Sequence, residues 1–264
     1  MPIWFYEVRP LFAAVIMLVF VESLSLIGLF LARRFLLPKF HYSEGINDAV
    51  SGTVQAIGVF YGITVGLIAV GVWNTNSNAS DLVSKEASAI GGIYRDVGSL
   101  PSPLREALWA KLREYTEFVI NQDWPAQKQG KILDGGTRIL NDFQADLFAY
   151  EPKTPGQVEL HAEALRAFNT LADCRRLRLN AVNSGLSGIM WGVIWVGAVI
   201  SIGVAYLFNI QDVKMHAMLV ALMGGFLALV LFMISINDKP FYGAVSVSPE
   251  PYQSLLDRIP TLSK

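Results

Sequence analysis

The chain has 264 residues, of which 53% are hydrophobic and only 16% are charged, and its mean hydropathy is +0.41. Soluble domains carry about 25% charged residues, so this composition argues against a soluble enzyme and against a disordered chain. Twenty-one basic and 22 acidic residues leave a net charge of −1, which excludes a basic surface covering the whole protein for nucleic acid. One cysteine and three scattered histidines predict neither a disulfide within the chain nor a metal or cofactor site.

Four apolar stretches are long enough to cross a bilayer, since about 20 helical residues span a hydrocarbon core of about 30 Å. The first is preceded by Glu7 and Arg9 and followed directly by Arg33 and Arg34. We therefore expect it to be a retained membrane helix and not a cleaved signal. The predicted spans are 11–32, 54–73, 186–208 and 215–236.

The segment 74–185 holds most of the charges and no further span. Apolar residues at three- and four-residue spacing predict that the second span continues as a helix to Val97, and that more amphipathic helices follow. Thr154-Pro155 is typical of the start of a long helix that reaches Arg178. The predicted fold class is an all-α integral membrane protein, with four transmembrane helices and a helical soluble domain inserted between spans 2 and 3. The expected divisions are 1–73, 74–185, 186–236 as a transmembrane hairpin, and 237–264 as a tail.

Four spans place both termini on the same side of the membrane as the middle segment. Near the span ends, that side carries more basic residues than the other, which predicts a cytoplasmic location for it. The basic residues on that side are Arg9, Lys85, Arg175, Arg176, Arg178 and Lys239, and those on the opposite side are Arg33, Arg34, Lys39 and Lys214.

The second span carries two contrasting faces. Gly58, Gly62 and Gly66 repeat every four residues and so share one narrow face, where another helix can approach closely. Polar side chains recur on the opposite face and are interrupted by two bulky apolar ones. The candidate pore-lining residues on that opposite face, here called the polar stripe, are Thr53, Phe60, Thr64, Leu67, Asn74 and Asn78.

Two interpretations of the polar stripe stay open. In the first, the stripe is a pore wall, and Phe60 and Leu67 form a constriction that can gate the path by dewetting. In the second, the threonine hydroxyls bond to their own helix backbone, and the asparagines lie outside the membrane, beyond Trp73.

Glu22 is the only acidic residue well inside a predicted span. A carboxylate at that depth is costly unless it is protonated, paired or hydrated. Gln55, near the start of the second span, is a candidate partner if the two residues lie at the same depth. The pattern is compatible with a proton-relay or gating role and with a structural hydrogen bond between helices.

Arg175, Arg176 and Arg178 lie where the long helix of the middle segment meets the third span. Such a cluster can anchor the chain at lipid head groups, or it can concentrate anions at a channel mouth.

Several motifs in order resemble a bestrophin-like membrane-protein family of unknown function (DUF4239). They are Trp73 at the end of the second span, the run 83–90, Leu100-Pro101, Trp124-Pro125, the run 175–178 and the run 238–243. That family is distantly similar to the bestrophin anion channels. The resemblance implies a homo-oligomer, by analogy a pentamer, in an inner membrane, with a pore lined by the second span and chloride as a candidate permeant ion.

The sequence and the resemblance together favour a homo-oligomeric ion channel embedded in membrane lipid. The alternative is a non-conducting membrane scaffold or signalling module that recruits a partner through its soluble domain. No phosphate-binding loop, nucleophile elbow or histidine beside a nucleophile is present, so we do not expect an enzyme.

Overall fold

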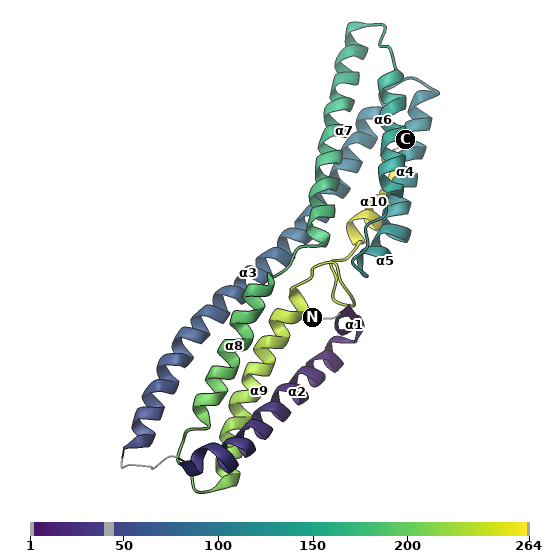
Figure 1. The fold of residues 1–264 in the computed structure, drawn as a ribbon. Helices are drawn as coiled ribbons and strands as arrows, with labels where there is room; N and C mark the ends of the chain where they lie inside the picture. Colours follow the sequence, from purple (N-terminus) through teal and green to yellow (C-terminus); the bar gives the residue numbers. More distant parts are fainter. Residues whose placement is uncertain (1–2, 40–44, 263–264) are drawn as a thin grey trace. The chain divides into compact units, whose positions relative to one another are not determined.

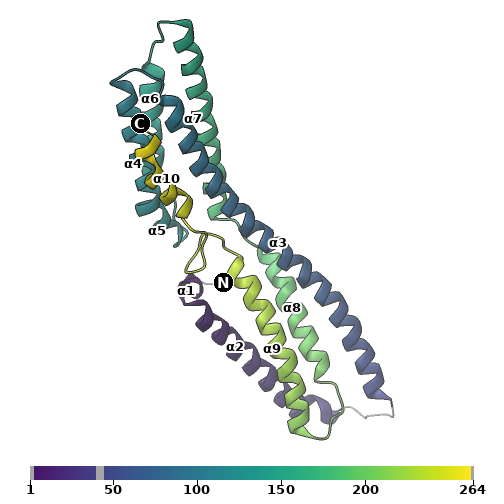
Figure 2. The same ribbon diagram turned by 180° about the vertical axis from the view of Figure 1, so that it is seen from behind.

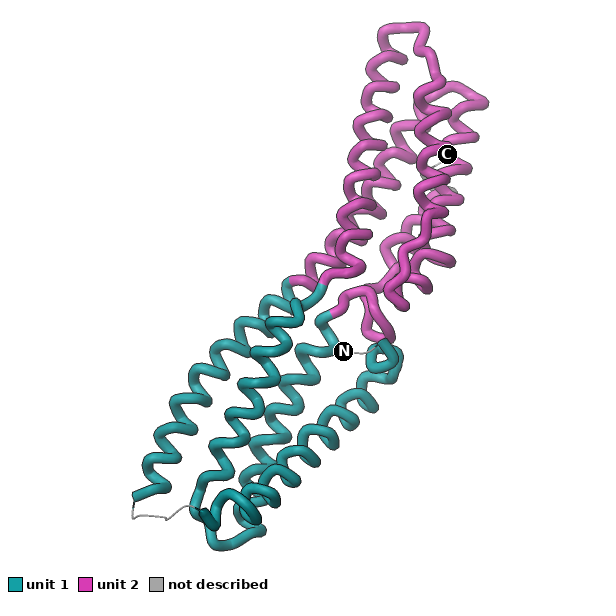
Figure 3. Tube along the Cα trace, in the orientation of Figure 1, with its two compact units in different colours: residues 1–74, 185–238 teal, residues 75–184, 239–264 magenta. Residues whose placement is uncertain are grey.

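The computed structural model describes residues 3–39 and 45–262, and within these ranges it contains helices and no strands. The chain divides into two compact units, which Figure 3 distinguishes by colour. Unit 1 comprises Met1–Asn74 and Gly185–Asp238, and unit 2 comprises Thr75–Ser184 and Lys239–Lys264. The fold class predicted from the sequence is confirmed.

Unit 1 contains the helices that are long and apolar enough to cross a membrane (Figure 1). Each of the four predicted spans overlaps one of these helices, although the third helix, Gly188–Ala205, is shorter than the predicted span 186–208. The helices of unit 1 are α1 (Ile3–Glu7), α2 (Pro10–Leu31) with its short continuations Ala32–Leu36 and Leu37–Lys39, the first half of α3 (Ile46–Val97), α8 (Gly188–Ala205) and α9 (Val213–Asn237).

Small residues let α2 pack closely along α9. Ser25 and Glu22 of α2 lie against Gly224 and Gly225 of α9, where no side chain separates the helices. Tyr206, just after α8, donates its hydroxyl to the carbonyl oxygen of Ser25 (2.8 Å). These contacts hold α2 against the hairpin that α8 and α9 form.

Unit 2 is a helical bundle around its own apolar core, seen from two sides in Figures 1 and 2. Thr154 caps α7 as the sequence predicts, because its hydroxyl accepts a bond from the Gln157 amide (3.3 Å). Trp109 stacks on Tyr94, with ring centroids 5.1 Å apart. The helices of unit 2 are the second half of α3, α4 (Leu104–Phe118) with the turn Val119–Asp123, α5 (Trp124–Gln127), α6 (Gly135–Ala149), α7 (Pro155–Val182) and α10 (Glu250–Leu262).

The C-terminal helix α10 belongs to the core of unit 2. Tyr252, Leu255 and Ile259 are buried in it, and the Trp124 ring meets Tyr252 edge to face at 5.7 Å. The sequence predicts only a tail here, because the few apolar residues of this segment do not indicate which surface they cover.

Candidate pore-lining face

Helix α3 is covered by the rest of its chain on only one side within unit 1. Val65 and Val72 are buried there, and Tyr61 beside them donates its hydroxyl to the Ile194 carbonyl oxygen of α8 (2.9 Å). Elsewhere the side chains of this helix project outward: Phe60 is 73% exposed and Leu67 is 70% exposed. A single chain therefore leaves most of the α3 circumference uncovered.

The predicted polar stripe lies on this uncovered surface, and all six of its residues are exposed. The Thr53 hydroxyl donates to the Ala49 carbonyl oxygen (2.9 Å), and the Thr64 hydroxyl donates to that of Phe60 (2.8 Å). These bonds use the hydroxyl protons but leave oxygen lone pairs that can accept from water. The hydroxyls are thus bonded to the backbone, as one interpretation expects, while the stripe stays open to whatever covers it.

The glycine face of α3 is also open. A Cβ added at Gly58, Gly62 or Gly66 would meet no atom of the described residues within 4 Å, so no other helix that the structure describes packs against these glycines. They form one wall of a groove of about 330 Å³, and Met223 and Phe226 of α9 lie in the other wall. The helix-packing role of these glycines stays a prediction, and the helix that packs against them would have to come from another chain.

Glu22 and Gln55 do not meet. The Glu22 carboxylate lies over the two glycines of α9, where a Cβ on Gly225 would be 2.8 Å from Oε1. Its Oε2 is buried and has no hydrogen-bond partner among the described residues. Gln55 instead donates to the Ser51 hydroxyl (3.3 Å) on the exposed side of α3. The proposed pairing is therefore wrong within one chain, because Glu22 lies between α2 and α9 while Gln55 lies on the exposed side of α3.

The three arginines of the predicted basic cluster have three different environments. Arg176 is exposed and pairs with Asp173 (3.0 Å), and Arg175 donates to the Thr137 hydroxyl (3.0 Å). Arg178 is fully buried in unit 2, where its Nε lies 2.6 Å from Oε2 of Glu86. The prediction of a mouth or membrane anchor is wrong for Arg178, because its charge is enclosed and neutralised.

A buried polar cluster surrounds that ion pair. Glu86 also accepts from the Tyr115 hydroxyl (2.5 Å). The Arg178 guanidinium lies over the Trp124 ring, 5.9 Å from its centroid, and 3.6 Å from an oxygen of Asp123, which is too far for a hydrogen bond. Burial raises the pKa of Asp123, and the Arg178 charge opposes part of that rise.

Asp123 is not among the candidate residues that the sequence predicts. Asp123 directly precedes Trp124-Pro125, and no charge pattern around it in the sequence indicates that it is buried. Glu86 and Arg178 are 92 residues apart in the sequence. The spacing of residues within one helix does not predict a contact between residues of two different helices.

Comparisons with known proteins agree with this architecture. A family model described as the Bestrophin-like domain matches residues 19–252. No curated protein matches the chain.

Solved structures provide similar folds at low sequence identity. A bacterial bestrophin homologue from Klebsiella pneumoniae is 11% identical with a TM-score of 0.65, over 95% of this chain and 98% of that one. A second structure of such a homologue from the same organism is 12% identical, with a TM-score of 0.63 and the same coverage. A further structure, described as a membrane protein, is 10% identical with a TM-score of 0.61, over 95% of this chain and 98% of that one. Since the family model covers most of its length, the chain is a membrane protein of the Bestrophin-like family.

Proposed function

We propose that the protein is a homo-oligomeric ion channel whose pore is lined by the polar stripe of α3. The observation that carries this proposal is the open surface of α3, where hydroxyl and amide groups alternate with Phe60 and Leu67 in a helix apolar enough to cross a membrane. Repeated polar groups are poor neighbours for lipid tails. In a water-filled path these polar groups can form hydrogen bonds with water.

Oligomerisation would cover both open faces of α3 at once. The groove beside Gly58, Gly62 and Gly66 can admit a helix of a second copy, because small residues allow close approach without a side-chain clash. A ring of copies arranged in this way would turn the opposite face of α3, which carries the polar stripe, toward the symmetry axis. The family resemblance supports a pentamer.

Phe60 and Leu67 are the candidate constriction. Rings of bulky apolar side chains can close a path to water by dewetting. The polar stripe itself contains no charged residue, so a preference for anions such as chloride rests on the resemblance to bestrophins. We further propose that unit 2 and both termini are cytoplasmic, in a bacterial inner membrane.

Ion flux from liposomes that contain the purified protein tests the proposal. Truncation of the constriction in Phe60→Ala and Leu67→Ala should raise the flux, and separate chloride and potassium gradients assign the charge preference. Val59→Ala is the matched control, because Val59 is 59% exposed on the same helix but projects about 100° away from Phe60.

The control variant should conduct as the wild type does. If correctly assembled wild type and both stripe variants are silent under every gradient, the protein is not a channel. That result would favour a scaffold that recruits a partner through unit 2.

A further inference from the structure

The turn that follows α2 is tied to the connection between α8 and α9 by Arg33. The Arg33 guanidinium donates to the carbonyl oxygens of Ile210 (2.9 Å) and Gln211 (3.4 Å). Its Nη1 also lies 3.0 Å from Nδ1 of His216, in the first turn of α9. All of these residues belong to unit 1. One side chain thus joins the end of α2 to the connection and to α9.

The bonds of His216 determine its protonation state. The side chain is buried, and its Nε2 lies 3.1 Å from the Ala205 carbonyl oxygen, which can only accept a hydrogen bond. The Arg33 guanidinium can only donate. His216 must therefore carry a proton on Nε2 and a lone pair on Nδ1, which is the neutral form of imidazole. A second proton, on Nδ1, would turn the contact with Arg33 into two donors and two positive charges 3.0 Å apart.

A second proton on His216 would meet no direct counter-charge. In the described part of the chain, no acidic side chain is bonded to His216 or to Arg33. The Asp212 carboxylate caps the start of α9 through two backbone amides, and the Tyr206 hydroxyl donates to the backbone of α2. The charged or titratable groups on the elements next to His216 or to the connection are Arg33, Arg34, Asp48, Tyr206, Asp212 and Lys214.

We infer that Arg33 and His216 form an acid-sensitive latch, which holds the end of α2 on the α8–α9 connection while His216 is neutral and opens when His216 takes a proton. Histidine is the side chain that changes its charge most readily near neutral pH, and repulsion between two like charges then replaces the hydrogen bond. Arg33 lies in the π-helical turn Ala32–Leu36, a rare geometry that is frequent at functional sites. The latch does not depend on whether the protein conducts ions.

The start of α3 holds the same connection through a second contact. The side-chain amide of Asn47 donates to the Asn209 carbonyl oxygen (3.3 Å), and its side-chain carbonyl accepts from the Asn209 backbone amide (2.8 Å). Neither group changes its charge between about pH 5 and 8. Opening of the latch should therefore free the connection from α2 and leave its contact with α3 in place.

Spin-label distances in the full-length protein in detergent test the latch. Cys174, the only native cysteine, is replaced by serine, and labels are attached to Phe35→Cys and Gln211→Cys, both at exposed positions. Labelled chains are diluted with unlabelled ones, so that each distance lies within one chain. As the pH falls from about 8 to about 5, the mean distance should lengthen by about 2 Å or more. Labels on Asp48→Cys and Gln211→Cys should keep their distance over the same range.

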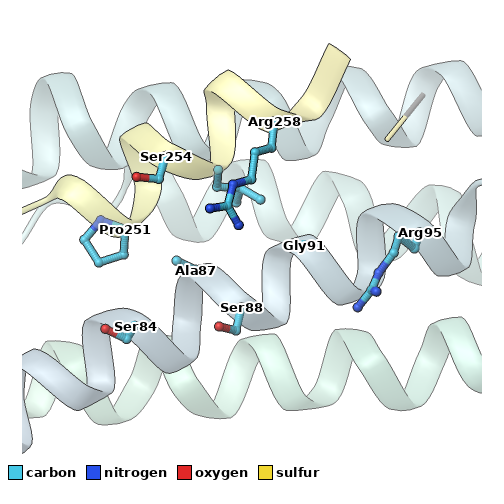
Figure 4. A pocket seen from close by; sticks show the side chains of 9 residues that line it. Ser84, Ala87, Ser88, Gly91, Arg95, Pro251, Ser254 and Arg258 are labelled. Carbon is cyan, nitrogen blue, oxygen red and sulfur yellow. The ribbon is translucent and has the colours of Figure 1, made fainter. Parts of the chain in front are cut away.

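Arg95→Gln is the matched control for the loss of an arginine. Arg95 lines a groove between α3 and α10 in unit 2 (Figure 4), and no histidine or acidic side chain is among the described residues that line this groove. The variant therefore removes one positive charge outside the unit that contains the latch. It should show the same acid response as the labelled parent.

Two further variants separate His216 from other titrating groups. His216→Gln keeps an acceptor for Arg33 and a donor for Ala205 but does not titrate, so it should keep the neutral-pH distance at both pH values. Arg33→Gln loses the guanidinium and should show the longer distance at both. The inference is overturned if the distance in the parent does not depend on pH, if His216→Gln responds to acid as the parent does, or if Arg95→Gln opens as Arg33→Gln does.

Discussion

At the scale of single residues, the buried ion pair of Glu86 and Arg178 is the feature of unit 2 whose disruption should cost the most stability. Both side chains are fully buried, and Glu86 bonds to Arg178 and to Tyr115 at the same time. Removing one charge leaves the other enclosed in a low-dielectric surrounding, which costs about 3–5 kcal/mol. The pair therefore joins α3 to α7, and replacement of either charged side chain alone should strongly lower the stability of unit 2.

Glu86→Gln should accordingly lower the free energy of unfolding by about 3–5 kcal/mol, measured by thermal or denaturant unfolding in detergent. Asp173→Asn is the control. It breaks the exposed pair with Arg176 and should cost about 0–1 kcal/mol. Equal losses in the two variants would show that burial of the Glu86 pair adds nothing.

Asp123 should give unit 2 a pH-dependent stability. Burial raises the pKa of Asp123 in the folded chain above its unfolded value, despite the opposing Arg178 charge. The folded state therefore binds this proton more tightly than the unfolded state does. The stabilisation from the Asp123 proton is complete below the unfolded pKa, about 3.9, and it is lost as the pH rises through the raised folded pKa.

Asp123→Asn removes this titration. The melting temperature of Asp123→Asn relative to wild type should consequently rise as the pH is raised from about 4 to about 8. Asp173→Asn, at an exposed position, serves as the control for the general effect of losing a carboxylate. A difference between Asp123→Asn and wild type that stays constant over this range, or falls, would contradict the assigned cause.

At the scale of elements, α3 shows what the sequence can and cannot predict. The spacing of apolar residues from Leu82 to Val97 predicts that the second span continues as a helix, and α3 is one helix over Ile46–Val97. The spacing of apolar residues predicts this helix correctly because it depends on the local backbone conformation and on one buried face. It does not report which partner covers that face, so the burial of Arg178 and the docking of α10 were not predicted.

The glycine groove of α3 allows a test of assembly that leaves the single chain intact. Gly62→Leu adds a side chain where no atom of residues 3–39 and 45–262 lies within 4 Å of the new Cβ, so the fold should survive while association weakens. Native mass spectrometry in detergent should show fewer oligomers than for wild type.

Two glycines of α8 serve as controls for the groove. Gly192→Leu also adds a side chain in open space, but outside the groove, and should keep the wild-type oligomer. Gly197→Ala places its Cβ against the Tyr61 ring and should lower stability instead. Intact oligomers in Gly62→Leu would contradict a helix-packing role for this face.

At the scale of the whole molecule, four apolar helices and a second, charged bundle could be predicted from composition and hydropathy alone. The candidate pore face could be predicted only as a pattern on one helix. The exposure of this face in the single chain agrees with a surface that an oligomer would cover. The proposed pore would need several copies, and the pattern of apolar and polar residues in one copy does not indicate how the copies are arranged. The proposed channel function therefore depends on whether the polar stripe meets water in the assembled protein.

The most direct measurement is modification of single cysteines by a charged methanethiosulfonate reagent during liposome flux. Cys174, the only native cysteine, is first replaced by serine, and Leu67→Cys is compared with Val59→Cys. A water-lined stripe predicts that the reagent reacts with the cysteine at position 67 and changes the flux, while the cysteine at position 59 stays unmodified. Modification at position 59 alone, or at neither position in a conducting protein, would contradict a pore lined by this face of α3.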